Sequence, residues 1–546
     1  MPKHHKMDNK TFYLGLCMAG AVSAGAYTAG VMDFLIESLQ AWDDAKKRSD
    51  PTVPTHDVQL SAIGGASAGG MTGIIVASGL GNAIDPVKLP PAGQPNDPGH
   101  QPSNKFFDAW VDLLQDDMLT VMLGTGDLAK GKAVSLLNAD FIEQVANKMI
   151  TAGITNPVER SYIAEELLLF ATMTNLQGFA YDLDFHSNDV PDDKYITTAH
   201  NDLATFRVAL DTPAYKNDGF IPLSVKDNTN LDLARAAAMA TGAFPVGLAS
   251  RSVTREANYV NDNRRFLNLT PPGKDVVPVG APYTGWYTDG GLVNNEPFDV
   301  TRKMLNITEG VDTHPANYTN YDTTNSTIVM VAPFPSQPEE QTFDGSPVLT
   351  NLVGNVLGAM ITQLRFKPEE LNAVFNKDDA SHYLIAPVRE DKVGDKAIAC
   401  GAMSGFSGFI HRSFRVHDYF LGRRNCQKFL QDVFVVPANT TNPIFVNGYA
   451  GVADKTPYTY VSDTNWLQII PVLITDEERL PDWPKISFDY ITNYSDQMET
   501  RLQQVIFSLF DLNWAKRTAY NLALKGNIND AALKWIKKSL TAQGLV

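Results

Sequence analysis

The pentapeptide Gly65-Ala66-Ser67-Ala68-Gly69 stands where this 546-residue sequence passes from an apolar segment into a run of small residues. It matches G-x-S-x-G, a pattern in which a strand turns sharply into a helix and a strained serine holds its oxygen clear of the backbone. Residues 58–63 before it predict a buried strand, and residues 70–77 after it predict a closely packed helix. Gly65 and Gly69 suit such a turn, since side chains there would collide with neighbouring backbone. We therefore expect Ser67 to be presented as a nucleophile.

Three further segments add specificity, because a short string of Gly, Ala and Ser is weak evidence alone. Residues 14–35 read as an apolar strand, a Gly/Ala-rich turn and an amphipathic helix, and free N–H groups at such a helix start form an anion site. Residues 234–245 predict a helix of small residues that ends at Phe244-Pro245. Asp289-Gly290-Gly291 offers a carboxylate that two glycines, Gly290 and Gly291, allow to approach another loop.

In the order of these segments the chain resembles the patatin-like phospholipases, serine acyl hydrolases that use a Ser-Asp dyad. The resemblance covers roughly residues 11–335, with weaker agreement at residues 170–176 and 326–335. It implies an α/β fold, a three-layer α/β/α sandwich, with Ser67 as nucleophile and Asp289 as base. It also implies that the backbone N–H groups of Gly20, Ala21 and Val22 form an oxyanion hole.

The oxyanion loop departs from the family's pattern. The family usually has a run of glycines, a variable residue, Arg or Lys, and then Gly, whereas this chain has Gly20-Ala21-Val22-Ser23-Ala24-Gly25. Backbone N–H groups do not depend on a side chain, but a β-branched residue such as Val22 disfavours positive φ. A patatin-fold scaffold protein of weak or absent activity is therefore one alternative reading.

The expected reaction is hydrolysis of carboxylic esters of lipids, most of all glycerophospholipids, through an acyl-enzyme on Ser67. Burial would raise the proton affinity of the Asp289 carboxylate, and negative charge would collect at the oxyanion loop. The lipid class comes from the resemblance alone, so an esterase or thioesterase of soluble acyl substrates is a second alternative. A third is an α/β-hydrolase triad, because Ser67, Asp289 and then His411 or His417 is also the chain order of that fold. That triad leaves the Asp-Gly-Gly and Phe-Pro motifs unexplained.

The sequence indicates no metal and no cofactor. Its ten histidines form no H-E-x-x-H pair, and its three cysteines show no C-x-x-C spacing. A net charge of −16 argues against nucleic acid as a partner and against broad attraction to anionic bilayers. We expect a lipid or membrane-interface substrate and peripheral membrane contact through local segments, with residues 349–364 and the Trp-bearing 531–540 as candidates. The oligomeric state is not indicated.

Four arginines close together, Arg412, Arg415, Arg423 and Arg424, suggest a phosphate head-group site. Structural ion pairs are the stronger expectation, because arginines on an aromatic-rich helix beside an aspartate commonly pair internally.

The motifs predict a catalytic α/β domain over residues 11–335, with a helical and loop insertion at about 81–165. Within it, residues 85–102 are rich in Pro and Gly and predict a loop that covers the site, while residues 104–150 and 158–169 show helical periodicity. A mainly helical region, 336–546, is expected to pack on the catalytic domain. Its predicted helices lie at 348–375 and 409–434, with a terminal pair in 496–540.

The N-terminal residues 3–24 imitate a secretory signal. Cleavage there would remove the predicted first strand and oxyanion loop, so the catalytic reading opposes the signal reading. No run of about 18 apolar residues free of Gly and charge predicts a membrane span. We expect a cytoplasmic protein, with export as an effector by another route left open.

Overall fold

The computed structural model describes residues 10–113, 117–130, 132–184, 194–266, 277–311, 318–335, 379–460, 463–510 and 525–546. The helices expected at 348–375, and with them the apolar face of 349–364, lie outside these residues.

A central sheet organises the described chain, with the strands in the order β5-β4-β3-β2-β1-β8-β9 and with β7 pairing both β3 and β6. The strands are β1 (Thr11–Met18), β2 (Asp57–Gly65), β3 (Ile163–Asp184), β4 (Lys194–Ala209), β5 (Ile221–Ser224), β6 (Arg251–Arg255), β7 (Tyr283–Asp289), β8 (Ser326–Val331) and β9 (His382–Ile385). Five neighbouring strands run parallel to one another: β3, β2, β1, β8 and β9. Strands β4 and β7 are antiparallel to β3. Parallel strands must be covered on both faces, which explains their nearly continuous apolar sequences.

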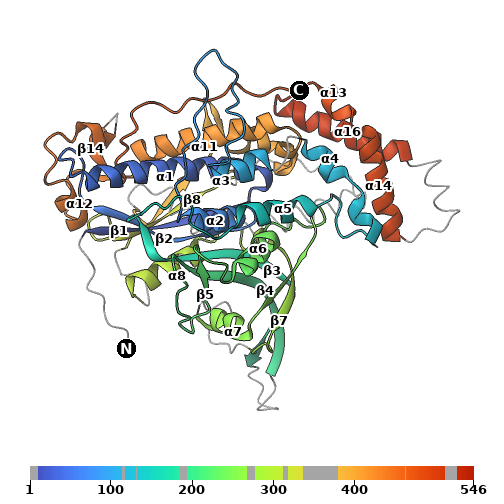
Figure 1. The fold of residues 1–546 in the computed structure, drawn as a ribbon, viewed down its shortest axis with the longest axis horizontal. Coiled ribbons are helices and arrows are strands. Elements are labelled where there is room, and N and C mark those ends of the chain that lie inside the picture. Colours follow the sequence, from blue (N-terminus) through green and yellow to red (C-terminus); the bar gives the residue numbers. More distant parts are fainter. Residues whose placement is uncertain are drawn as a thin grey trace.

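Helices cover both faces of this sheet (Figure 1). Alternate residues of β1 point to opposite sides: Leu16 and Met18 join the apolar core under α1 and α2, whereas Cys17 packs with the helix on the other face, α8. The helices are α1 (Gly25–Lys47), α2 (Ala68–Gly79), α6 (Leu231–Thr241), α7 (Ala257–Phe266) and α8 (Phe298–Glu309). The expected three-layer α/β/α sandwich is confirmed.

The helix α1 is buried along most of its length, because α11 (Arg412–Asp432) lies against it (Figure 1). Two glycines allow this approach: a side chain at Gly30 would overlap the backbone of Tyr419, and one at Gly422 would overlap the backbone of Tyr27. The helix α11 corresponds to the helix predicted over 409–434. It packs on α1, which begins directly after the oxyanion loop.

Other parts of the region after residue 336 also join the first half of the chain. The strand β9 extends the central sheet, and a separate sheet has the order β12-β14-β13. Its strands are β12 (Val435–Pro437), β13 (Thr459–Tyr460) and β14 (Asp463–Gln468), and β10 (Val388–Arg389) pairs with β11 (Lys392–Val393). The helices are α12 (Pro443–Gly448), α13 (Phe488–Thr492), α14 (Ser495–Phe510) and α16 (Lys525–Ala542). Residues on the two sides of position 336 thus share one sheet.

The segment between α2 and β3 has short helices and turns over residues 105–149, after the loop of residues 85–102. It contains α3 (Lys105–Phe107), a π-helical turn η2 (Asp108–Asp112), α4 (Met118–Leu123), a 3₁₀ turn η3 (Gly126–Lys130) and α5 (Asp140–Met149). The helical reading of residues 158–169 was wrong, because β3 begins at Ile163 and pairs with β2 and β4. An apolar run of this length can form either a helix or a strand, and here it forms a strand because it pairs with β2.

The Pro- and Gly-rich loop, residues 85–102, was predicted to cover the site, but it does not lie over Ser67. Its Lys88 binds Glu37 of α1 and Glu478, and its Asp97 pairs with Arg412 of α11. The loop therefore lies on the outer side of α1 and α11.

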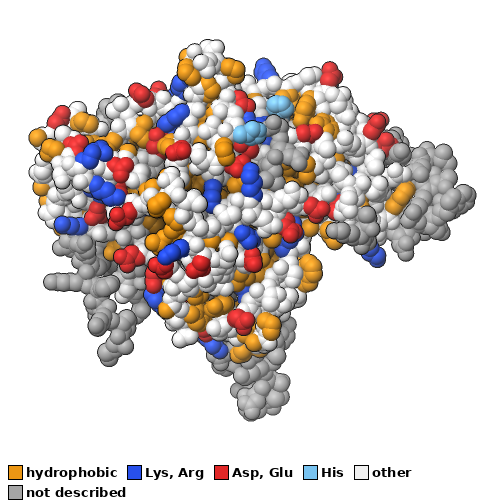
Figure 2. Space-filling model, viewed as in Figure 1, with side chains coloured by type: hydrophobic (Ala, Val, Ile, Leu, Met, Phe, Trp, Pro, Cys, Tyr) orange, Lys and Arg blue, Asp and Glu red, His pale blue; other side chains and the backbone are white. Residues whose placement is uncertain are grey.

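Acidic, basic and apolar side chains are interspersed over the face drawn in Figure 2. Lipid contact on this face would depend on local apolar side chains, because no continuous basic surface is seen in that view.

Candidate active site

Ser67 occupies the sharp turn between β2 and α2. Its backbone has a φ of +52°, a strained conformation for a residue other than glycine. Side chains at Gly65 or Gly69 would overlap the carbonyl of Met18 at the end of β1. The N–H group of Ser67 donates to Thr241 Oγ1 at 2.9 Å, which ties the turn to the end of α6.

Asp289 ends β7 directly opposite this turn. Ser67 Oγ donates to Asp289 Oδ2 at 2.6 Å, and the two residues are 6% and 4% exposed. The other carboxylate oxygen, Oδ1, accepts from the N–H group of Gly291 at 2.7 Å. One oxygen is therefore held by the Gly-Gly turn while the other faces the serine. The two residues that the sequence pairs as nucleophile and base lie in direct contact.

The Phe-Pro loop and β3 fix the position of this aspartate. The N–H group of Asp289 donates to Ala243 O at 3.0 Å, and its own carbonyl accepts from Thr174 Oγ1 at 2.7 Å. Gly290 lies so close to the backbone of Thr172 that a side chain there would overlap it. Sequence reasoning missed Thr174 and Thr241, because a single threonine in an apolar segment gives no signal of its contacts.

The oxyanion loop lies beside the serine. Gly20, Ala21 and Val22 line a small cavity together with Ser67 and Asp289. A side-chain carbon on Gly20 would stand 3.1 Å from Ser67 Cβ, which shows how closely the loop approaches. Val22 has a φ of +49° despite its branched side chain. No described residue accepts a hydrogen bond from the N–H groups of Ala21 and Val22, so they can serve an anion in the cavity.

The two histidines of the rival triad lie elsewhere. His417 is fully buried, with Nδ1 2.7 Å from Asp418 and its ring against Trp483. His411 caps the start of α11, where it accepts from the N–H group of Ser413. Neither residue lines the cavities at Ser67, so chain order alone was a misleading guide to a triad.

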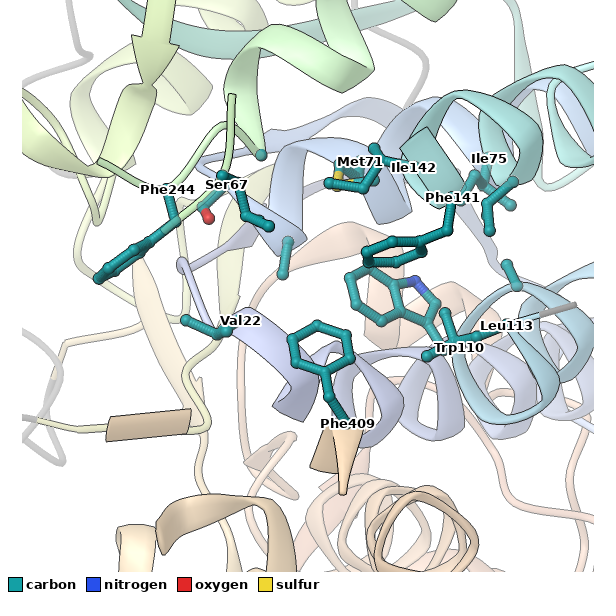
Figure 3. A pocket seen from close by; sticks show the side chains of 15 residues that line it. Val22, Ser67, Met71, Ile75, Trp110, Leu113, Phe141, Ile142, Phe244 and Phe409 are labelled. Carbon is teal, nitrogen blue, oxygen red and sulfur yellow. The ribbon is translucent and has the colours of Figure 1, made fainter. Parts of the chain in front are cut away.

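An apolar pocket begins at Ser67 and runs beside α2 (Figure 3). Ala68, Met71 and Ile75 line it from one face of α2, over about 10 Å of helix at 1.5 Å per residue. The space along it that no protein atom fills, together with the open solvent at its mouth, is about 570 Å³. The remaining lining side chains are apolar and come from distant segments: Val22, Ala109, Trp110, Leu113, Phe141, Ile142, Val145, Phe244, Leu248 and Phe409.

Six of these ten side chains belong to the insertion, and their position depends on α11. Trp110 lies on the π-helical turn and packs against Gly25, where a side chain would overlap the indole ring. Arg415 donates to Val111 O at 2.7 Å, and Arg412 binds Asp112 at 2.8 Å. These arginines hold the turn that carries Trp110.

The four arginines accordingly make internal contacts and not an open phosphate site. Arg423 is fully buried among the carboxylates of Asp33, Glu37 and Glu478. Arg424 pairs with Glu477 at 2.7 Å. The expectation of structural ion pairs is the one that the contacts support.

A family model for patatin-like phospholipases matches residues 16–302, which include Ser67, Asp289 and the oxyanion loop. The chain belongs to the patatin-like phospholipase family. This family consists of lipid acyl hydrolases, enzymes of the esterase and lipase type. The patatin-like chain is also 31% identical over 542 residues to the uncharacterized protein y4iI of Sinorhizobium fredii (strain NBRC 101917 / NGR234). That similarity covers 91% of this chain and 76% of the Sinorhizobium protein, so it extends beyond the family match into the second half of the chain.

The described part of this patatin-like protein has neither a cluster of metal-binding side chains nor a membrane-spanning helix. No group of three or more His, Cys, Asp or Glu residues there is arranged to hold a metal ion. Among the described helices, none combines the length and apolar character needed to cross a bilayer.

Proposed function

We propose that this protein hydrolyses carboxylic ester bonds of glycerophospholipids or related lipids, with Ser67 as nucleophile and Asp289 as general base. The observation that carries this proposal is the 2.6 Å hydrogen bond between the two side chains at the end of an apolar pocket. The serine is thus activated at the place where an acyl chain can be buried.

In the first half of the reaction, Ser67 Oγ attacks the ester carbonyl carbon while its proton passes to Asp289 Oδ2. The carbonyl oxygen gains negative charge and accepts hydrogen bonds from the N–H groups of Gly20, Ala21 and Val22. The intermediate then collapses, the ester C–O bond breaks, and the departing alcohol takes the proton from Asp289. An acyl-enzyme ester on Ser67 remains.

In the second half, water attacks the acyl-enzyme and gives its proton to Asp289. Collapse of the second intermediate releases the fatty acid and returns the proton to Ser67 Oγ. The hydrogen bond from Gly291 to Oδ1 keeps the carboxylate oriented, with Oδ2 toward the serine, in both halves.

The apolar pocket favours a lipid as the substrate over a small soluble ester. Its lining is apolar apart from Ser67, and a methylene transferred into such surroundings gains about 0.8 kcal/mol. A long acyl chain beside α2 would use this gain, whereas an acetyl group would leave most of the pocket empty.

The test is fatty-acid release from mixed micelles of phosphatidylcholine or triacylglycerol, and from short-chain monomeric esters, by wild type, Ser67→Ala and Asp289→Asn. We expect release from micelles by the wild type, and a loss of at least about a thousandfold in each variant, as in other nucleophile–base units. A fluorophosphonate probe should label the wild type and leave Ser67→Ala unlabelled.

Other outcomes favour the alternatives. Activity on monomeric esters with no preference for micelles would make the protein an esterase of soluble substrates. Wild-type protein that neither reacts with the probe nor releases fatty acid would favour a scaffold role. Activity that survives in Asp289→Asn would remove Asp289 from the mechanism.

A further inference from the structure

The conformation of Val22 needs support from outside its own loop. A branched side chain at a φ of +49° is unfavourable. Val22 is the first residue of the 3₁₀ turn η1 (Val22–Ala24), and this turn has no side-chain cap. Ser23 is the one polar side chain in this turn. It is fully buried, and its hydroxyl contacts the second half of the chain.

The hydroxyl of Ser23 makes two contacts with residues almost 400 positions away. It donates to the carbonyl of Gly405 and accepts from the N–H group of Gly408 at 3.0 Å. Both partners are glycines for steric reasons. A side-chain carbon on Gly405 would stand 3.1 Å from Val22 Cβ, and one on Gly408 would overlap Ser23 Oγ. Residues 399–409, which we name the clamp segment, therefore press directly against the oxyanion loop.

The clamp segment is itself strained and fastened. Met403, Ser404 and Gly405 all have positive φ, of 56°, 54° and 95°. One end is held by α11, where Asp418 accepts from the N–H groups of Ala399 and Cys400 at 2.7 and 2.8 Å. Strain of this kind persists only where surrounding contacts over-determine it.

Helix α16 holds the middle of the clamp segment, and Gln543, directly after this helix, holds the residues before the segment. Ser539 Oγ accepts from the N–H group of Met403 at 2.9 Å. The side-chain amide of Gln543 donates to Asp395 O at 2.7 Å and to Ile398 O at 2.8 Å. A continuous series of contacts thus leads from α16 through the clamp segment to the loop beside Ser67.

We propose that Ser23 is a positioning residue that, with the clamp segment, holds Val22 in the left-handed conformation that aims the N–H groups of Ala21 and Val22 at the oxyanion. This inference rests on the proposed function, because it assigns those N–H groups a part in the reaction. It gives the second half of the chain a catalytic purpose: its helices α11 and α16 keep the oxyanion loop in place.

The test compares Ser23→Ala with Ser38→Ala. Ser38 is a matched control, because it is also a fully buried serine near the start of the chain but its hydroxyl contacts no hydrogen-bond partner among the described residues. Loss of one oxyanion donor costs about 100-fold to 1,000-fold in kcat, so a loosened loop should cost roughly 10-fold to 100-fold. We expect that fall in kcat for Ser23→Ala, a KM within about twofold, and wild-type kinetics for Ser38→Ala.

A rescue experiment separates positioning from general destabilisation. In the double variant Val22→Gly/Ser23→Ala, glycine adopts positive φ without strain, so kcat should recover at least about threefold over Ser23→Ala. A surface variant, Gln543→Ala, perturbs the clamp segment from its far side and should lower kcat without changing KM. Circular dichroism and thermal melting establish that each variant is folded.

Wild-type kcat in folded Ser23→Ala would overturn the proposal, as would a double variant no more active than Ser23→Ala. If Ser23→Ala does not fold, the Gln543→Ala result decides in its place, and an unchanged kcat there counts against the proposal. Failure of the proposed function is distinct, because it would appear as activity in Ser67→Ala or as a wild type that neither releases fatty acid nor reacts with the fluorophosphonate probe.

Discussion

Acidification from pH 7.5 to pH 5.0 should destabilise this protein through the buried side chain of His56. Its ring packs against Trp42, Phe445 and Tyr449 at centroid distances of 4.9, 5.3 and 5.6 Å. Nε2 lies 2.8 Å from Ile469 O, whereas Nδ1 contacts no hydrogen-bond partner among the described residues. A protonated ring would therefore bury a charge with one N–H group unsatisfied.

Burial lowers the pKa of His56 from 6.5 to about 4, and the nearby charge of Lys46 adds to this effect. In the unfolded chain the ring takes up a proton as the pH falls through 6.5, while in the folded chain it stays neutral until about pH 4. Stability is therefore lost between these two values as the pH falls, and is unaffected by this group above pH 7. Linkage gives a loss of about 2 kcal/mol at pH 5.0 and about 3 kcal/mol below pH 4.

The assay is urea unfolding of wild type and His56→Gln at pH 7.5 and pH 5.0, followed by tryptophan fluorescence. The glutamine amide can still donate to Ile469 O but does not titrate, so any fixed cost of the substitution cancels between the two pH values. The wild type should lose about 2 kcal/mol more than the variant on acidification. His56 directly precedes β2, whereas Ser67 follows the other end of that strand, so esterase activity at pH 7.5 should be unchanged.

Equal losses in the two proteins would refute this reasoning. It would mean that the folded state accepts a proton at His56 as readily as the unfolded chain does, through water or through a movement of the aromatic cluster.

Two further changes test the ion cluster and the pocket. Arg423→Met would leave the buried Asp33 without its cation, while Glu37 and Glu478 would keep Lys88, and it should lower the unfolding free energy by roughly 3–5 kcal/mol in chemical denaturation; a change under about 1 kcal/mol would show that water already screens the cluster. Ile75→Trp would fill the pocket two turns along α2 from Ser67, and should shift the preference in kcat/KM toward shorter acyl chains, by about fourfold for each methylene excluded. An unchanged chain-length profile would place the acyl group elsewhere.

Much of the site could be predicted from the sequence because its motifs are local. The glycines around Ser67 and after Asp289 permit close backbone approaches that side chains would prevent, and such requirements are visible residue by residue. The same is true of the apolar segment before Ser67, which forms β2. By contrast, residues 158–169 were misread as helical, because an apolar run takes its state from the neighbour with which it pairs.

The sequence by itself determined the strand–turn–helix unit at Ser67 and the Gly-Gly turn after Asp289, because each depends on backbone freedom at a few fixed positions; the resemblance to the family implied the pairing of Ser67 with Asp289. Only the tertiary structure decided the shape of the pocket, whose walls bring Trp110, Phe141 and Phe409 together from separate segments. It also decided the conformation of Val22, which local propensity opposes. Long-range packing and hydrogen bonding can outweigh the backbone preference of one residue. The neighbouring sequence does not indicate which distant residues make those contacts.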